Sequence, residues 1–398
     1  MSIPPGDEAH YDWDPRDESM FLHKASEYDA LRERRPVAYS KLQGWSLLRH
    51  ADVVAALTDP HEFSSRVSDH VAVPNGMDGA EHASYRAIVD RCFTPERVAG
   101  FEPRLRAISE ELVAGLLRGP RPFEVMSALG EPYAAMAQCG YLGWSADVAR
   151  ALRHWAADSL QASRAHDRAA LDRVAAHFDE IIVAELENAR AAGADGPRTL
   201  THDLLDERID GRPLTDDELV SIVRNWTAGE LGTIAAAVGI VLAFLARNPQ
   251  VQRQLREHPE LRQPAMDEML RLEPPLIANR RRTTRRVHVA GRTIPADARV
   301  TVLWPGAQRD PEAFDDPTAF RLDRDPAPNL LYGRGPHYCP GEGLSRLELG
   351  VLLDVLLAGL PTFHLAAEPV LASFPAGGFA EVWLDWSDPA ESAGSGQP

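Results

Sequence analysis

A single cysteine stands in a glycine-rich loop just before a stretch with helical periodicity. The loop runs from Tyr332 to Gly341 and carries His337 and Cys339, and Gly333 within it permits a positive φ and close approach of a flat or bulky group. Cys339 precedes the N-terminus of the predicted helix, where free N–H groups and the helix dipole favour a negatively charged sulfur. This arrangement suits a thiolate presented to a metal, although a lone cysteine is also a common buried hydrophobe. Zinc is disfavoured because no second cysteine lies nearby.

Polar pairs at helical spacing form a second group of candidates. Glu268 and Arg271 are three residues apart and His82 and Arg86 are four apart, so each pair shares one face of a helix. Taken alone, a solvated Glu–Arg pair of this kind contributes only about 0.2–0.5 kcal/mol. The function of both pairs therefore depends on which other groups the folded chain places beside them.

A long helix positions a third set of residues. Thr215 and Glu218 have the spacing of a capping box, which predicts a helix that begins there and runs to about Arg247. Within it, Glu230 and Thr233 lie three residues apart and share one face. Glu230 is either a catalytic acid or an acid on the helix surface.

The cysteine loop resembles the haem-binding loop of the cytochromes P450, whose signature is an aromatic residue followed by Gly-x-Gly-x-His-x-Cys-x-Gly. Every fixed position matches, with Tyr332 where phenylalanine is usual and Gly333 at the first glycine. The resemblance implies that Cys339 is the axial thiolate of haem b and that His337 bonds a haem propionate. An anionic thiolate pushes electron density onto the iron and favours O–O cleavage.

The two polar pairs extend this resemblance. Glu268 and Arg271 match the family's Glu-x-x-Arg, which joins a later arginine, here Arg324, to hold the haem loop in place. His82 and Arg86 match its His-x-x-x-Arg, in which both side chains bind haem propionates. The first pair is thus expected to shape the site, and the second to hold the cofactor.

The resemblance implies one more propionate ligand, Arg281, which Arg280 and Arg282 flank. Two carboxylates would then face His82, Arg86, Arg281 and His337. Charge-assisted hydrogen bonds of this kind are about twice as strong as neutral ones. The set therefore makes chemical sense as an anchor for one dianionic group.

The long helix departs from the family pattern. Members usually read Ala/Gly-Gly-x-acid-Thr where this helix crosses the distal haem face, and the acid and alcohol form a proton relay. Here Gly229 is the matching glycine, but without a gap Leu231 replaces the acid and Gly232 replaces the threonine. Neither of these two side chains relays a proton.

Three interpretations of this departure remain open. In the first, Glu230 or Thr233 reaches the pocket through an alternative register or through a local distortion, which Gly229 and Gly232 would permit. In the second, ordered water or a substrate hydroxyl forms the relay. In the third, the enzyme takes hydrogen peroxide directly, and Glu230 acts as general base and acid.

The resemblance runs from about Val37 to Trp386 and implies a mainly α protein, with one large helical domain and a small β-rich lobe. We expect a polar N-terminal segment at 1–20, the catalytic domain at 21–387 and a disordered tail at 388–398, where Ser, Gly, Pro and Glu are frequent. With 398 residues, 44% of them hydrophobic, the chain is long enough to bury a large core.

Composition narrows the class of partner and compartment. The formal net charge of −17 argues against a general nucleic-acid binder. Three cysteines are too few for a disulfide framework, which favours a reducing cytosol. The first residues are polar and contain no apolar run of about 18 residues, so we expect a cytoplasmic, bacterial-type monomer without a membrane anchor.

The resemblance implies a monooxygenase that inserts one oxygen atom into a small or medium, mainly apolar organic substrate. Electrons would come from a ferredoxin and its reductase, which would dock on arginines near the cysteine such as Arg346. The alternatives are a hydrogen-peroxide-driven peroxygenase, an enzyme of the same fold that couples or rearranges its substrate, and a haem sensor without turnover.

Overall fold

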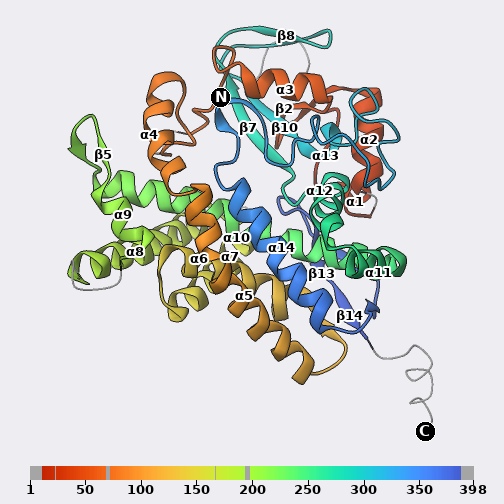
Figure 1. Cartoon of the computed structure of the whole chain (residues 1–398). Helices are drawn as coiled ribbons and strands as arrows, with labels where there is room; N and C mark the ends of the chain where they lie inside the picture. Colours follow the sequence, from red (N-terminus) through yellow and green to blue (C-terminus); the bar gives the residue numbers. More distant parts are fainter. Residues whose placement is uncertain (1–10, 23, 69–71, 166, 193–197, 387–398) are drawn as a thin grey trace.

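The computed structural model describes residues 11–386, apart from residues 23, 69–71, 166 and 193–197. The predicted tail and residues 1–10 of the predicted N-terminal segment therefore lie outside the described residues. The chain forms a helical body with a smaller β-rich part against one side of it (Figure 1). This arrangement confirms the predicted fold class.

Helix α10 (Asp216–Arg247) runs through the helical body (Figure 1). It starts with the predicted capping box: the Glu218 N–H donates to Thr215 Oγ1 at 3.3 Å, and the Thr215 N–H donates to Glu218 Oε2 at 2.7 Å. Among the described residues it is the one helix long and apolar enough to cross a membrane, yet 72% of its apolar window is buried inside the molecule. It is therefore the core helix on which the body is built.

Helices from both halves of the chain pack on α10. They include α6 (Glu131–Leu142), α8 (Arg168–Ala192), α12 (Arg262–Leu272) and α14 (Glu342–Gly359). Helix α5 (Pro95–Arg118) in turn lies along α14. Its buried residues follow the spacing of one face of an amphipathic helix: Val98, Phe101, Leu105, Ile108, Ser109, Val113 and Leu116.

The longer helix α7 and several shorter helices lie partly in the helical body and partly beside the β-rich part (Figure 1). Trp13 and Met20, near the start of the described chain, are buried against Tyr28 and Leu31. The remaining α-helices are α1 (Glu18–Leu22), α2 (Lys24–Arg34), α3 (His50–Thr58), α4 (Gly79–Arg91), α7 (Ala146–Ala165), α9 (Leu200–Asp206), α11 (Pro249–Glu257) and α13 (Trp304–Ala307).

The β-rich part is a five-stranded sheet in the order β1-β2-β10-β7-β3. Strand β10 pairs parallel to β2 and antiparallel to β7, so residues from distant parts of the chain lie side by side. Buried side chains of β2 and β10 pack beneath α3 in an apolar cluster separate from that of the helical body. The strands are β1 (Val37–Ser40), β2 (Gly44–Leu47), β3 (Phe63–Ser64), β7 (Ala278–Thr283) and β10 (Arg299–Leu303).

Short hairpins and edge strands account for the rest of the β structure. Strands β11, β14 and β4 form a three-stranded sheet, and three further two-stranded pairs are described. Their bounds are β4 (Phe123–Glu124), β5 (Arg208–Ile209), β6 (Arg212–Pro213), β8 (Val287–Val289), β9 (Arg292–Ile294), β11 (His364–Leu365), β12 (Val370–Leu371), β13 (Phe379–Glu381) and β14 (Trp383–Asp385).

Candidate active site

A cavity of about 350 Å³ lies between α10, the cysteine loop and the sheet. Its volume is in the range of ligand-binding pockets. The cavity collects predicted site residues from widely separated segments. Those that line it are His82, Arg86, Gly229, Glu230, Thr233, Arg281, Tyr332, Gly333, His337 and Cys339.

Backbone hydrogen bonds fold the cysteine loop back on itself. The Cys339 N–H donates to the Tyr332 carbonyl at 2.9 Å, and the Gly333 N–H donates to the Leu330 carbonyl at 2.8 Å. Gly335 has a φ of +76°, and a Cβ there would lie 2.6 Å from the Leu57 carbonyl oxygen. Only glycine therefore lets the loop approach α3 this closely.

The loop makes Cys339 chemically different from the two other cysteines. Burial raises the pKa of the Cys339 thiol to about 11, against the opposing effects of the Gly341 N–H and of Arg86. A metal at the sulfur would displace this proton, because a coordinating thiol is deprotonated outright. Cys92 and Cys139 are buried in the helical core and do not line the cavity.

Basic side chains, two histidines and two arginines, gather beside the loop. The rings of His82 and His337 lie 4.0 Å apart between centroids, and Ser65 Oγ lies 2.9 Å from His337 Nε2. Burial, His82 and Arg281 together lower the pKa of His337 to about 4. Burial, followed by the positive charge of Arg86, also lowers the pKa of His82.

Arg281 carries the clearest electrostatic imbalance. Its side chain is buried and donates to the Arg280 carbonyl at 2.8 Å. No carboxylate among the described residues forms an ion pair with it, although the charge of Asp78 acts on it. Arg86 differs, because Asp90 already accepts from it at 2.6 Å. A buried charge without a partner is costly. The carboxylates of one bound group would balance this cluster, so the residues fit a haem with two propionates.

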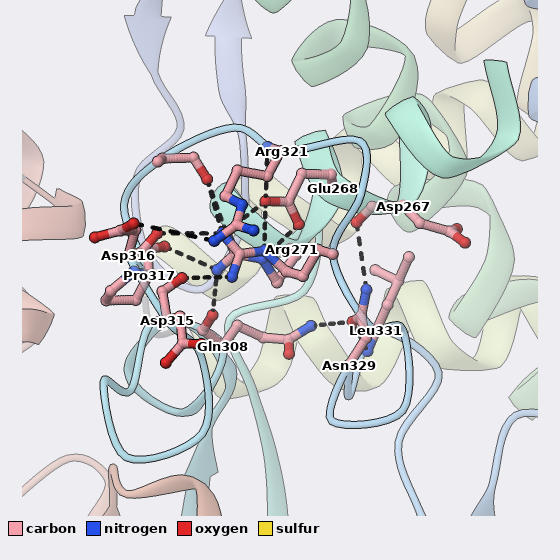
Figure 2. Close-up of polar contacts among 12 residues, drawn as sticks. Asp267, Glu268, Arg271, Gln308, Asp315, Asp316, Pro317, Arg321, Asn329 and Leu331 are labelled. Carbon is pink, nitrogen blue, oxygen red and sulfur yellow. Dashed lines mark hydrogen bonds and ion pairs between the residues drawn. The ribbon is translucent and has the colours of Figure 1, made fainter. Parts of the chain in front are cut away.

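Glu268, Arg271 and Arg324 come together in a buried network (Figure 2). Arg271 donates twice to Glu268, at 2.7 and 2.9 Å, and Arg324 Nε donates to Glu268 Oε1 at 2.8 Å. The two arginines also donate to backbone carbonyls of the segment that precedes the cysteine loop. These carbonyls belong to Gln308, Asp315, Asp316, Pro317 and Ala319.

Gln308 and Asn329 extend this network to the loop, and no sequence motif points to them. The Gln308 amide donates to Asn329 Oδ1 at 2.6 Å (Figure 2). Its oxygen accepts from the Leu330 N–H at 2.9 Å. Asn329 Oδ1 also accepts from the Leu331 N–H at 2.9 Å. The position of the loop thus depends on two amides that carry no charge and have no fixed spacing from the cysteine.

Helix α10 forms the cavity wall without any break in its helical structure, so Glu230 and Thr233 reach the cavity in an alternative register and not through a local distortion. Thr233 Oγ1 donates to the Gly229 carbonyl at 2.7 Å, and Glu230 and Thr233 both line the cavity. Leu231 is instead buried in the apolar core. Gly232 is not among the lining residues, and nothing lies within 4 Å of the place where its Cβ would be.

Glu230 is not an acid on the helix surface. Its side chain is 8% exposed and accepts a hydrogen bond from Trp226 Nε1 at 2.7 Å. Burial raises its pKa to about 7. A carboxyl group in this state exchanges protons near neutral pH, which a general acid or base requires.

Further residues from distant segments complete the cavity wall. They are Asn75, Asn225, Trp226, Leu276 and Asn279. Arg346, predicted to be an exposed docking residue, is 35% exposed at its side chain. It pairs with Asp267 and Glu342, each at 3.1 Å.

Comparison with known proteins gives a consistent result. A family model described as Cytochrome P450 matches residues 157–359. Cyclomarin C epoxidase CymV of Salinispora arenicola is 30% identical over 355 residues, which are 85% of this chain and 89% of that protein. Erythromycin C-12 hydroxylase of Saccharopolyspora erythraea is 30% identical over 339 residues, 82% of this chain and 85% of that protein.

Solved structures agree with these relatives. Cytochrome P450 CYP109Q5 from Chondromyces apiculatus superposes with a TM-score of 0.84 at 28% identity, over 94% of this chain and 97% of that one. A mutant of P450 EryK in complex with erythromycin B gives a TM-score of 0.81 at 25% identity, over 92% and 97% of the two chains.

Proposed function

This chain belongs to the cytochrome P450 family of haem-thiolate monooxygenases, and we propose that it inserts one oxygen atom into a small or medium, mainly apolar organic substrate. In this proposal Cys339 is the axial ligand of the haem iron. The observation that carries it is the position of Cys339, which lines the cavity opposite α10 while the two other cysteines do not.

The same proposal assigns a function to the basic residues beside the loop. Arg281, His82 and His337 would bind the haem propionates, with Arg86 beside them: Arg281 is a buried charge without an ion pair among the described residues, and the two imidazole rings offer N–H donors. Tyr332 and Gly333 of the loop and Gly229 of α10 line the cavity and would contact the haem there. Glu268, Arg271 and Arg324 act at a distance, by holding the loop through Gln308.

When bound, the haem supplies dioxygen activation and oxygen-atom transfer. The residues of α10 supply the protons. Glu230 exchanges a proton near neutral pH at the cavity wall, and the Thr233 hydroxyl donates to the Gly229 carbonyl beside it. In this proposal Glu230 and Thr233 form the proton relay in place of the usual acid–alcohol pair.

The cavity lining supports an apolar substrate with a few polar groups. Ile222, Ile234, Leu276 and Trp304 offer apolar surface, and asparagines at 75, 225 and 279 offer hydrogen bonds. The relatives include a protein named as an epoxidase and one named as a hydroxylase, which fits oxygen insertion here. We place the enzyme in the cytoplasm as a monomer, with a ferredoxin and its reductase as electron donors.

The test is a ligand screen that follows the haem spin state, with turnover of every hit under dioxygen and a ferredoxin pair. A tight-binding ligand should be converted into a product that carries one oxygen atom from dioxygen. If no native or surrogate ferredoxin pair supports product formation from any tight-binding ligand, the proposal fails.

A second candidate is a peroxygenase, favoured by one observation: Leu231 and Gly232 stand where an acid and an alcohol are usual, while Glu230 lines the cavity. Turnover with hydrogen peroxide and no reductase should then be fast, and Glu230→Gln should depress it. Rapid haem bleaching with little product would rule out this activity, and an unchanged rate in Glu230→Gln would remove Glu230 from it.

A further inference from the structure

A second buried carboxyl group lies directly behind Glu230. Glu348, on α14, is 0% exposed, and its carboxyl makes a hydrogen-bonding contact with that of Glu230 on α10. No N–H or neutral hydroxyl group among the described residues donates to either Glu348 oxygen. Because an ionised carboxylate only accepts hydrogen bonds, the contact requires a proton on one of the two carboxyl groups.

Donors gather on Glu230 and not on Glu348. Trp226 Nε1 donates to Glu230 at 2.7 Å. The buried Gln138 amide is best satisfied with its nitrogen toward Glu230, 2.7 Å from Oε1, and its oxygen accepting from Thr227 Oγ1 at 2.9 Å. Donors stabilise the charged form of a carboxyl group, so Glu230 is the ionised member and Glu348 the protonated one.

Burial gives the same assignment. Two adjacent carboxylates cannot both ionise in a dry site, and burial raises the pKa of each member. The pKa of Glu230 rises to about 7, and that of Glu348 rises well above its ordinary value because of burial and the charge of Glu230. Asp267 and Glu268 lie on another helix and already have arginine partners.

The other titratable groups around the carboxyl pair do not change their protonation state near neutral pH. Tyr133 and Tyr141 face it from α6, and burial raises the pKa of both. Burial also raises the pKa of Cys139 to about 12. Cys339, whose charge acts on Glu230 from the loop, is a thiolate when it binds iron. The carboxyl pair is therefore what titrates here.

We infer that Glu348 is the proton reserve of the site: it stores one proton in its contact with ionised Glu230 and passes it to Glu230, which gives it to the cavity. The proton moves from a Glu348 oxygen to a Glu230 oxygen and then leaves Glu230 for the cavity, and a proton from solvent restores the pair to its singly protonated state. This inference rests on the proposed function. Glu348 acts through Glu230 and is a positioning residue, since it does not line the cavity.

The first measurement is infrared spectroscopy of the haem-loaded enzyme at neutral pH. The C=O band of a buried protonated carboxyl group should be present in the wild type and absent in Glu348→Gln. It should remain in Glu230→Gln, since Glu230 is the ionised member. It should also remain in Glu111→Gln, a control in which an exposed carboxyl group on α5 is removed.

The second measurement is turnover under dioxygen and a ferredoxin pair. In Glu348→Gln, product per electron pair should fall about tenfold and its solvent deuterium effect should rise, with haem content and substrate-induced spin change unaltered. A purely structural role of Glu348 would lower the free energy of unfolding. It would leave the solvent deuterium effect and the pH dependence of turnover unchanged.

The outcomes separate this inference from the function on which it rests. If the wild type makes no product, the proposed function fails. If the wild type turns over but Glu348→Gln keeps the band and the pH profile, the proton reserve alone is overturned. If Glu348→Gln does not fold, Glu230→Gln decides: a retained band supports the assignment, and a lost band places the proton on Glu230 and overturns it.

Discussion

The carbonyl oxygen of Gln308 accepts a hydrogen bond from the fully buried Arg271 at 2.7 Å. The side chain of the same Gln308 holds Asn329 and Leu330 at the start of the cysteine loop. One residue therefore connects the buried ion-pair network to the segment that carries the metal ligand. Loss of the Gln308 amide should loosen the loop while the ion pairs stay intact.

Gln308→Ala should lower the free energy of unfolding by about 2–3 kcal/mol, because two hydrogen bonds are lost and the buried Leu330 N–H is left without an acceptor. Haem should also dissociate faster. Urea unfolding and haem transfer to an acceptor protein measure both effects. Gln250→Ala, at an exposed position on α11, is the control, and equal behaviour of the two variants would contradict the role of Gln308.

Cys339→Ser should abolish the thiolate signature in the carbon monoxide difference spectrum of the reduced protein. The reason is that the serine hydroxyl keeps its proton and donates far less electron density to iron. Cys139→Ala, which removes a buried core thiol, should leave that spectrum unchanged. A thiolate spectrum that survives Cys339→Ser would assign the axial ligand to another residue.

The protein without haem should lose stability as the pH falls from about 6.5 toward 4. In the folded state the pKa of His337 is lowered to about 4, whereas unfolding restores its ordinary value near 6.5. The unfolded state binds more protons between these values, so the free energy of unfolding rises with pH across this window and falls as the pH drops. Urea unfolding at a series of pH values measures this slope.

Arg281→Leu should flatten that slope, since Arg281 is one cause of the lowered pKa of His337. It should also weaken haem binding. Arg282→Leu is the matched control on the same strand, because the Arg282 side chain is 44% exposed and pairs with Asp297. Identical slopes in the two variants would show that Arg281 does not act on His337.

Gly232→Ala should raise the free energy of unfolding by about 0.5–1 kcal/mol, since nothing crowds the new methyl group and alanine is the better helix former. In the same helix, Gly239→Ala would place a Cβ 2.6 Å from Met126 Sδ and should cost about 1–3 kcal/mol. Thermal unfolding of both variants provides the check. A destabilising Gly232→Ala would mean that another group occupies the space beside α10.

The spacing of residues along the sequence predicted those contacts of the site in which both residues lie on one helix or belong to one recognised motif. Glu268 and Arg271 share one turn of α12, and the Thr215–Glu218 box begins α10 as its spacing requires. Gln308 and Glu348 were missed because each acts across elements, and an amide or an acid on a helix has no distinctive spacing. The burial of Glu230 also escaped prediction, since it depends on how α14 packs against α10.

The close approach of Gly335 to Leu57 and Thr58 sets a limit on how this scaffold can change. Any side chain at position 335 would push the loop away from α3 and move the sulfur with it, whatever substrate the enzyme handles. Variation that adapts the enzyme to new molecules is expected instead on the opposite wall, at residues of α10 that line the cavity, such as Ile222 and Asn225. Directed evolution of this protein should accept substitutions on α10 far more readily than at position 335.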